Sequence, residues 1–215
     1  YRILDIADLT TDGCFVLGMA VSVSCCASGH PFAGVILGMI AGGCAGCVTA
    51  VLQTQLGVPS ILAGIVTNTG LYTINLMAMG WSSNISLLKN ETIFSLFKKT
   101  NIGGAWNAII LAGMIALCAM VLMKWFLSTR LGLSIRATGD NRDMVSASSI
   151  NPRFTILVGL VVANMFTGLS GALAGQLQKS ADINAGSGIV TIGLATLIIG
   201  ETLIQGRKSI GRNIC

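Results

Sequence analysis

The stretch Thr129–Arg153, TRLGLSIRATGDNRDMVSASSINPR, is a polar interruption between two long apolar runs of the sequence. Loops that carry an excess of Lys and Arg beside membrane spans lie in the cytoplasm. We therefore predict that residues 129–153 form a cytoplasmic loop, and this assignment gives every other segment its direction. The basic residues that support it are Lys124, Arg130, Arg136, Arg142 and Arg153.

The composition is that of a membrane protein. Of the 215 residues, 53% are hydrophobic and 10% are charged, whereas about 25% of residues are charged in soluble domains. We predict an all-α polytopic protein in the lipid bilayer, with one transmembrane domain over residues 1–215. The net charge of +5 comes from basic residues at the ends of apolar runs, so no nucleic acid partner is expected. Because the chain opens at Tyr1 without a methionine, we expect a fragment that lacks helices at one or both ends.

About six apolar runs are expected to enter the membrane, and the first and last are short. The first run has 15 residues, which is about 22 Å of helix against a hydrocarbon core of about 30 Å. Counting from the cytoplasmic loop, residues 81–104 form an extracytoplasmic loop, although this places Lys89, Lys98 and Lys99 outside. The six runs are Cys14–Ser28, Phe32–Leu52, Val58–Gly80, Ala105–Leu127, Phe154–Leu177 and Ile189–Ile204.

Glycines recur at a spacing of four along the second run. This spacing places them on one helix face, where a neighbouring backbone can approach closely. The stripe that we expect to pack consists of Gly34, Gly38, Gly42 and Gly46.

The two short runs resemble each other. Ala7-Asp8-Leu9 precedes the first and Ala181-Asp182-Ile183 precedes the last, with glycines at matching places downstream. In the predicted topology the two runs cross in opposite directions. Short, glycine-interrupted segments in corresponding positions are typical of inverted repeats and indicate a transport pathway between them. Chance recurrence and local thinning of the bilayer remain open as explanations.

Polar side chains within the apolar runs are candidates for a function or for helix packing. Glu201 is the only acid deep in such a run, which makes it a functional candidate unless it forms a salt bridge with a nearby basic residue. Asp12 is a candidate cap for the helix that follows it. No metal site is predicted, and the C-x-x-C pair Cys44 and Cys47 is interpreted as apolar filler. The intramembrane amides, which line pathways or bridge helices, are Asn68, Asn75, Asn164 and Gln176.

The cytoplasmic loop contains a capping signal. Asp140 precedes Asn141-Arg142-Asp143, with an acid at the third helical position, and Asn151-Pro152 ends the helix. We predict a helix from Asp140 to Ile150 that presents Met144 and Val145. A simple connector does not need such a helix, but a docking element for a partner does.

At these residues the chain resembles the permeases of ABC importers of the branched-chain amino acid type. The resemblance is carried by Arg136-Ala137-Thr138-Gly139-Asp140-Asn141, by Leu62-Ala63-Gly64-Ile65 and by Ile192–Glu201. It extends to a subgroup paired with a lipoprotein-type binding protein, some members being associated with aromatic amino acids. Ser149 and Lys179 depart from the pattern, at places where we expect a glycine and a small residue.

The resemblance implies a multi-pass permease of the bacterial plasma membrane that imports a small solute, most naturally an amino acid. It implies a second permease copy, two cytoplasmic ATPase subunits and an extracytoplasmic substrate-binding protein. The sequence contains no G-x-x-x-x-G-K-[ST] motif, so ATP and Mg²⁺ are expected on the partner ATPase, with no cofactor and no enzymatic activity in this chain.

On this interpretation two groups of residues carry the function. The coupling residues expected to contact the ATPase are Arg136, Asp140, Asn141 and Arg142. The residues expected to line the substrate pathway are Asp8, Thr10, Thr11, Asn68, Asn75, Asp182 and Asn184. Two alternatives remain open at this stage, namely an ion-coupled secondary transporter in which Glu201 or Asp182 binds the cation, and a non-transporting membrane scaffold.

Overall fold

A computed structural model describes residues 8–87, 90–99, 106–148 and 150–212. Helices dominate these residues, with two short strands between them. The elements are α1 (Thr11–Ala27), α2 (Pro31–Thr54), α3 (Ser60–Ala78), β1 (Asn84–Ser86), α4 (Ile93–Lys99), α5 (Asn107–Ser128), α6 (Arg130–Asp140), α7 (Arg142–Ala147), α8 (Pro152–Gln178), β2 (Ser180–Asp182) and α9 (Ile189–Arg212).

The predicted class, an all-α polytopic membrane protein, is confirmed. Four helices, α2, α3, α5 and α8, are long and apolar enough to cross a bilayer, and α1 and residues Ile189–Gly200 of α9 are shorter apolar helices. Each of the six predicted runs corresponds to one of these helices. The last predicted run, Ile189–Ile204, lies within α9, which continues to Arg212 and includes the basic segment.

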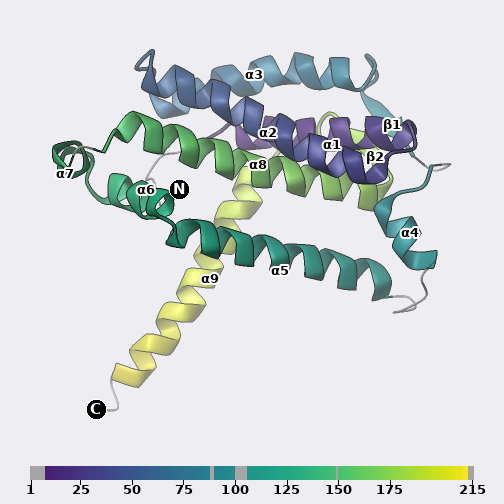
Figure 1. Cartoon of the computed structure of the whole chain (residues 1–215). Coiled ribbons are helices and arrows are strands. Elements are labelled where there is room, and N and C mark those ends of the chain that lie inside the picture. The colour runs from purple at the N-terminus through teal and green to yellow at the C-terminus, as the bar shows by residue number, and fades with distance from the viewer. Residues whose placement is uncertain (1–7, 88–89, 100–105, 149, 213–215) are drawn as a thin grey trace.

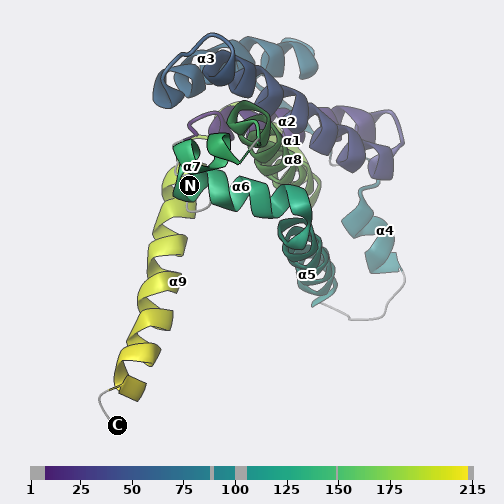
Figure 2. The same cartoon turned by 60° about the vertical axis from the view of Figure 1, so that its left-hand side comes forward.

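The helices α1, α2, α3 and α8 form a bundle, with α5 lying along the side of α8 away from α3 (Figure 1). At one end of the bundle lie α6 and α7, and at the other lie β1, β2 and α4. Both views show α9 leaving the bundle at a steep angle (Figures 1 and 2). The bundle therefore has two distinct ends, each formed by one of the predicted loops.

The glycine stripe of α2 packs as predicted. A Cβ atom on Gly34 or on Gly38 would lie 2.8 Å from a backbone oxygen of α1, and one on Gly42 or on Gly46 would lie 2.5 or 2.9 Å from a backbone oxygen of α8. Such distances are too short for a side chain. The stripe therefore lets α2 lie directly against the backbones of α1 and α8.

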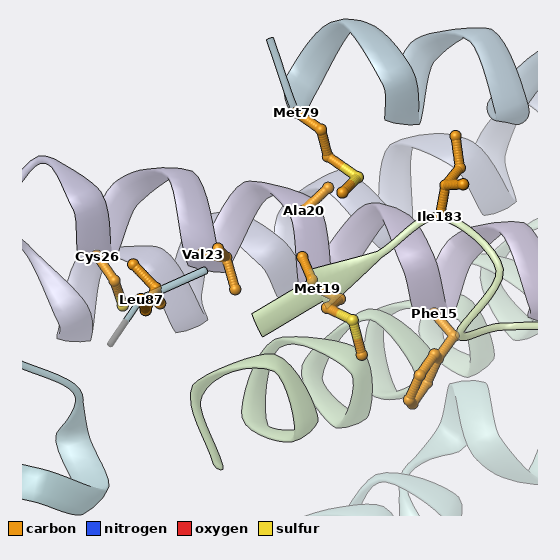
Figure 3. Packing of buried hydrophobic residues seen from close by; sticks show 9 residues of the cluster. Phe15, Met19, Ala20, Val23, Cys26, Met79, Leu87 and Ile183 are labelled. Carbon is orange, nitrogen blue, oxygen red and sulfur yellow. The ribbon is translucent and has the colours of Figure 1, made fainter. Parts of the chain in front are cut away.

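One cluster of buried hydrophobic residues lies at the end of the bundle that carries the strands. Phe15, Met19 and Val23 of α1 pack there against Met79, Leu87 and Ile183 from other segments (Figure 3). Strands β1 and β2 pair antiparallel, with Ile85 opposite Ala181. This pairing ties the predicted extracytoplasmic loop to the segment between α8 and α9.

Helix α1 begins at the depth of the bundle's centre. The Cys14 thiol donates to Gly42 O, halfway along α2, at 3.9 Å, and Gly13 packs against Asn68, near the middle of α3. Asp8, just before α1, accepts a hydrogen bond from Asn164 Nδ2, near the middle of α8, at 2.7 Å. The first short run is therefore a helix that starts inside the membrane, which explains its length.

The predicted cytoplasmic loop, residues 129–153, contains two helices instead of one. Residues 130–140 form α6, capped by Thr129, whose hydroxyl accepts from Gly132 N at 3.3 Å. The helix predicted from Asp140 to Ile150 is wrong at both ends, because Asp140 is the last residue of α6 and α7 spans only Arg142–Ala147. Asn141 is extended (φ −157°) and its Oδ1 accepts from Asp143 N and Met144 N, both at 3.0 Å. The capping signal therefore belongs to Asn141, and it separates two helices.

Lys179 ends α8 in a left-handed conformation, with φ 55°. Glycine is the usual residue at such a C-terminal position, because it lacks the Cβ atom that makes positive φ unfavourable. The left-handed backbone explains why a small residue is expected at position 179 in place of lysine. Ser149, the other departure, lies outside the described residues.

Candidate functional site

An open cavity of about 350 Å³ lies where α1 begins, between α1, α3 and the turn before α9. We call it the central cavity, because α1 begins halfway along α2 and α3. Seven of its eleven lining residues have polar side chains, and polar groups within a membrane bundle are costly and typical of a functional site. The lining residues are Asp12, Gly13, Val16, Asn68, Thr69, Tyr72, Asn75, Ile183, Asn184, Gly186 and Ser187.

Three of the seven predicted pathway residues, Asn68, Asn75 and Asn184, line the central cavity. Asn75 is 2% exposed; its Nδ2 donates to Gly13 O at 3.2 Å, and its buried Oδ1 accepts no hydrogen bond from the described residues. A buried carbonyl oxygen without a donor costs about 1–3 kcal/mol. The Asn75 side chain is thus held in place by its Nδ2, whereas its Oδ1 lacks a hydrogen bond.

Two further pathway residues line a different cavity. Asp8 and Thr11 face a more apolar space of about 520 Å³ between α1, α8 and α9, which we call the lateral cavity. Asn164 also lines it, and Asn164 Oδ1 is buried without a partner among the described residues. The sequence grouped all seven residues in one pathway, but α1 separates these two spaces.

The remaining two pathway residues line neither cavity. Thr10 is completely buried, and its hydroxyl lies 2.9 Å from that of Thr49 on α2. Asp182 accepts from Asn184 N at 2.7 Å and from Asn84 Nδ2 at 3.4 Å. Asp182 therefore shapes the turn that carries Asn184, and Thr10 fastens the start of α1.

The two segments that resemble each other in sequence also share a backbone feature. Asp8 Oδ1 accepts from Thr10 N at 2.9 Å, and Asp182 Oδ1 accepts from Asn184 N at 2.7 Å. In both places the acid stabilises a turn that precedes a helix, α1 in the first case and α9 in the second. The sequence similarity of the two segments therefore has a local physical basis in these turns.

The beginnings of α1 and α9 meet at Asp12. Its Oδ1 accepts a hydrogen bond from Val190 N, in the first turn of α9, at 3.1 Å. The expectation that Asp12 caps its own helix is wrong: Thr10 occupies that position without a side-chain cap, and Asp12 caps α9 instead. Asp12 was not predicted to line the pathway, because its contact with a residue 178 positions away leaves no local signal in the sequence.

The other intramembrane candidates have different environments. Gln176 is fully buried, and its amide group bridges Ser22 Oγ, Pro31 O and Ile93 N at 2.8–3.1 Å. It joins helices, which is the structural alternative for such amides. Glu201 belongs to α9, but its side chain lies outside the described part of the structure.

The predicted coupling residues lie together at the α6–α7 end. Arg136, Asp140 and Asn141 are exposed, whereas Arg142 begins α7 and its side chain is not described. Met144 is 68% exposed and its neighbour Val145 is 3% exposed. This end therefore combines a short capped helix with exposed charges and exposed apolar side chains, of which Met144 lies on α7 and Leu133 on α6.

The same end is fastened to the bundle by α8. The hydroxyl groups of Thr138 on α6 and Thr155 on α8 lie 2.8 Å apart and are buried. Asn151 caps α8 by accepting from Arg153 N at 3.0 Å. A displacement of α6 and α7 would therefore act on α8, which carries Asn164 and its bond to Asp8.

Comparisons with known proteins identify the family of this chain. Residues 1–214 match the family described as branched-chain amino acid transport system / permease component. The chain is 32% identical over 206 residues to the tyrosine transport system permease protein of Clostridioides difficile (strain R20291), covering 95% of this chain and 67% of that protein. It is 34% identical to an uncharacterized protein of Rickettsia prowazekii (strain Madrid E), covering 94% and 70%. It is 29% identical to the D-allose transport system permease protein AlsC of Escherichia coli (strain K12), covering 89% and 57%. No solved structure gives a significant match.

Proposed function

We propose a mechanism for this chain, which belongs to the family of permease components of branched-chain amino acid transport systems. Membership makes it a transport subunit for a small solute in an ABC importer, and a multi-pass protein of the bacterial plasma membrane. It also decides against the ion-coupled carrier and the scaffold. The mechanism concerns the solute, its path and the coupling to ATP.

The solute is an amino acid, and the central cavity is a segment of its path. The polar lining at the start of α1 is the observation that supports this path. Asn68, Asn75 and Asn184 provide amide groups that can exchange hydrogen bonds with a solute that has lost its water. The family and the relative named for tyrosine transport support the choice of an amino acid.

Two partners act at opposite ends of the bundle. Residues 129–153 are cytoplasmic and α7 docks on an ATPase subunit, which binds ATP and Mg²⁺. Residues 81–104 are extracytoplasmic and receive the substrate-binding protein, and a second copy of the permease completes the pathway. The exposed Met144 and the charges of Arg136 and Asp140 suit the ATPase contact, because interfaces commonly combine an apolar anchor with a polar rim.

Motion passes from the docking end to the cavity through α8. ATP-driven movement of α7 and α6 shifts α8 at the Thr138–Thr155 contact. Helix α8 in turn holds Asp8 through Asn164, so the start of α1 moves with it. Since the first turn of α1 forms one wall of the central cavity, this movement opens or closes the cavity in alternating access.

Reconstitution tests the function. The full-length permease is placed in vesicles with its ATPase and binding protein, and uptake of radiolabelled amino acids is measured with and without ATP. We expect uptake that requires ATP and stimulation of ATP hydrolysis by the loaded binding protein. Replacing Asp140–Arg142 by alanines should abolish both, and unchanged uptake in that variant would disprove the coupling role.

A further inference from the structure

The central cavity contains more acceptors of hydrogen bonds than its surroundings satisfy. Asn75 Oδ1 is buried and accepts nothing from the described residues. Asp12 uses Oδ1 to cap α9, and its Oδ2 accepts no hydrogen bond from the described residues. A ligand that brings hydrogen-bond donors to this wall would satisfy both oxygens.

Side chains from α3 contact Gly13, the residue that follows Asp12 in α1. Asn75 donates to Gly13 O at 3.2 Å, and Asp12 is the preceding residue. Asn68 Oδ1 lies 2.5 Å from the place where a Cβ atom of Gly13 would be. One carboxylate side chain and two amide side chains therefore lie beside the first turn of α1, and Asn68 Oδ1 occupies space that a side chain on Gly13 would need.

The charge of the lining is negative. Asp12 is acidic, and the eleven lining residues include no Lys, Arg or His. A carboxylate at this depth is costly unless something compensates it. The Val190 N–H at the start of α9 compensates part of this negative charge. A positively charged ligand would compensate the remainder.

We propose that Asp12, Asn75 and Asn68 form the site that binds the protonated amino group of the transported solute. A primary ammonium group has three N–H donors, one for each of these three side chains, which all carry an oxygen acceptor. Val16 and Ile183 in the same lining provide apolar surface for the rest of the solute. This inference rests on the proposed function, and it adds the group of the solute that is recognised and the residues that recognise it.

The test uses the full-length permease with its ATPase and binding protein in vesicles, and the probe is an equimolar mixture of radiolabelled amino acids. Asp12→Asn keeps the oxygen that caps α9 but removes the charge. We expect it to lower uptake about tenfold or more, the loss expected for one charge-assisted hydrogen bond. Asp12→Glu should restore much of the uptake. ATP hydrolysis stimulated by the loaded binding protein should persist in both variants, which shows that they fold and assemble.

A matched pair at Asn75 separates recognition from structure. Both Asn75→Leu and Asn75→Asp lose the donor to Gly13 O, but only Asn75→Asp keeps an oxygen for the ammonium group. We expect uptake to be lost in Asn75→Leu and retained in Asn75→Asp. Equal loss in the two variants would assign Asn75 a purely structural role and overturn the proposal. The comparison at Asn75 remains a valid test even if Asp12→Asn fails to assemble.

The remaining outcomes are also decisive. If wild-type vesicles take up no amino acid, the proposed solute class is wrong. If they do, and uptake by Asp12→Asn stays within about twofold of wild type, the ammonium site alone is wrong. Replacing sodium by choline should leave uptake unchanged, and a requirement for sodium would indicate that the oxygens bind this ion instead.

Discussion

The contact between α2 and α8 predicts how the protein responds to one added methyl group. In Gly42→Ala, the new Cβ atom would lie 2.5 Å from Asn164 O, about 0.9 Å short of the 3.4 Å at which ordinary contact begins. Gly168 Cα, 3.0 Å away, closes off the same side. Because both obstacles are backbone atoms, the two helices must separate instead of adjusting a side chain.

The expected cost follows from this geometry. Overpacking of a close contact costs about 1–3 kcal/mol, and the higher helix propensity of alanine returns about 0.5–1 kcal/mol. A net loss of about 1 kcal/mol lowers the melting temperature of a chain this long by about 2–4 °C. Gly70→Ala on α3 is the matched control, because nothing lies within 4 Å of its Cβ position.

Thermal unfolding of the purified full-length permease in one detergent measures both variants. We expect Gly42→Ala to melt below wild type and Gly70→Ala to melt at the wild-type temperature or slightly above it. Because Asn164 also holds Asp8, Gly42→Ala should reduce uptake as well. Equal melting temperatures for the two variants would refute the close approach of α2 and α8.

Three further changes test other contacts. Thr138→Val and Thr155→Val should show a coupling energy of about 1 kcal/mol in a double-mutant cycle of unfolding, because each removes the same buried contact; additive effects would contradict this. Lys179→Gly should raise the melting temperature by a few degrees, because glycine has no Cβ atom and avoids the steric cost of about 1 kcal/mol that lysine has at this positive φ. A decrease would show that the lysine side chain is needed. Asn141→Ala should destabilise α7 by about 1 kcal/mol and weaken ATPase binding measured by co-purification, while the melting temperature of the bundle stays near that of wild type.

The membrane fold was predictable because each bilayer-crossing helix leaves a long apolar run. The glycine spacing predicted the close face of α2 for the same reason, since both signals are local. Helix α6 was missed, because the sequence of Arg130–Asp140 is as polar as a loop. Its boundaries become clear only when Thr129 is seen to cap α6 and Asn141 to cap α7. The capping signal was recognised, but Asp140 was chosen in place of the next residue.

The candidate site was predictable only in part. Asn68 and Asn75 were noticed because amides are unusual in apolar helices, and both line the central cavity. The sequence could not show that α1 separates Asp8 from them, since that depends on the depth at which α1 begins. Asp12 was interpreted as a local cap because acids are common at helix starts, whereas its partner is Val190 in a distant helix.

The central claim is that the solute passes through the central cavity. The most direct test compares initial rates of ATP-driven uptake for Asn68→Leu, which removes a polar group of that cavity, and Ser170→Leu, which fills the lateral cavity. With binding-protein-stimulated ATP hydrolysis retained in both, we predict that Asn68→Leu lowers the rate about tenfold or more and that Ser170→Leu stays within about twofold of wild type. The opposite order would place the path in the lateral cavity and contradict the mechanism.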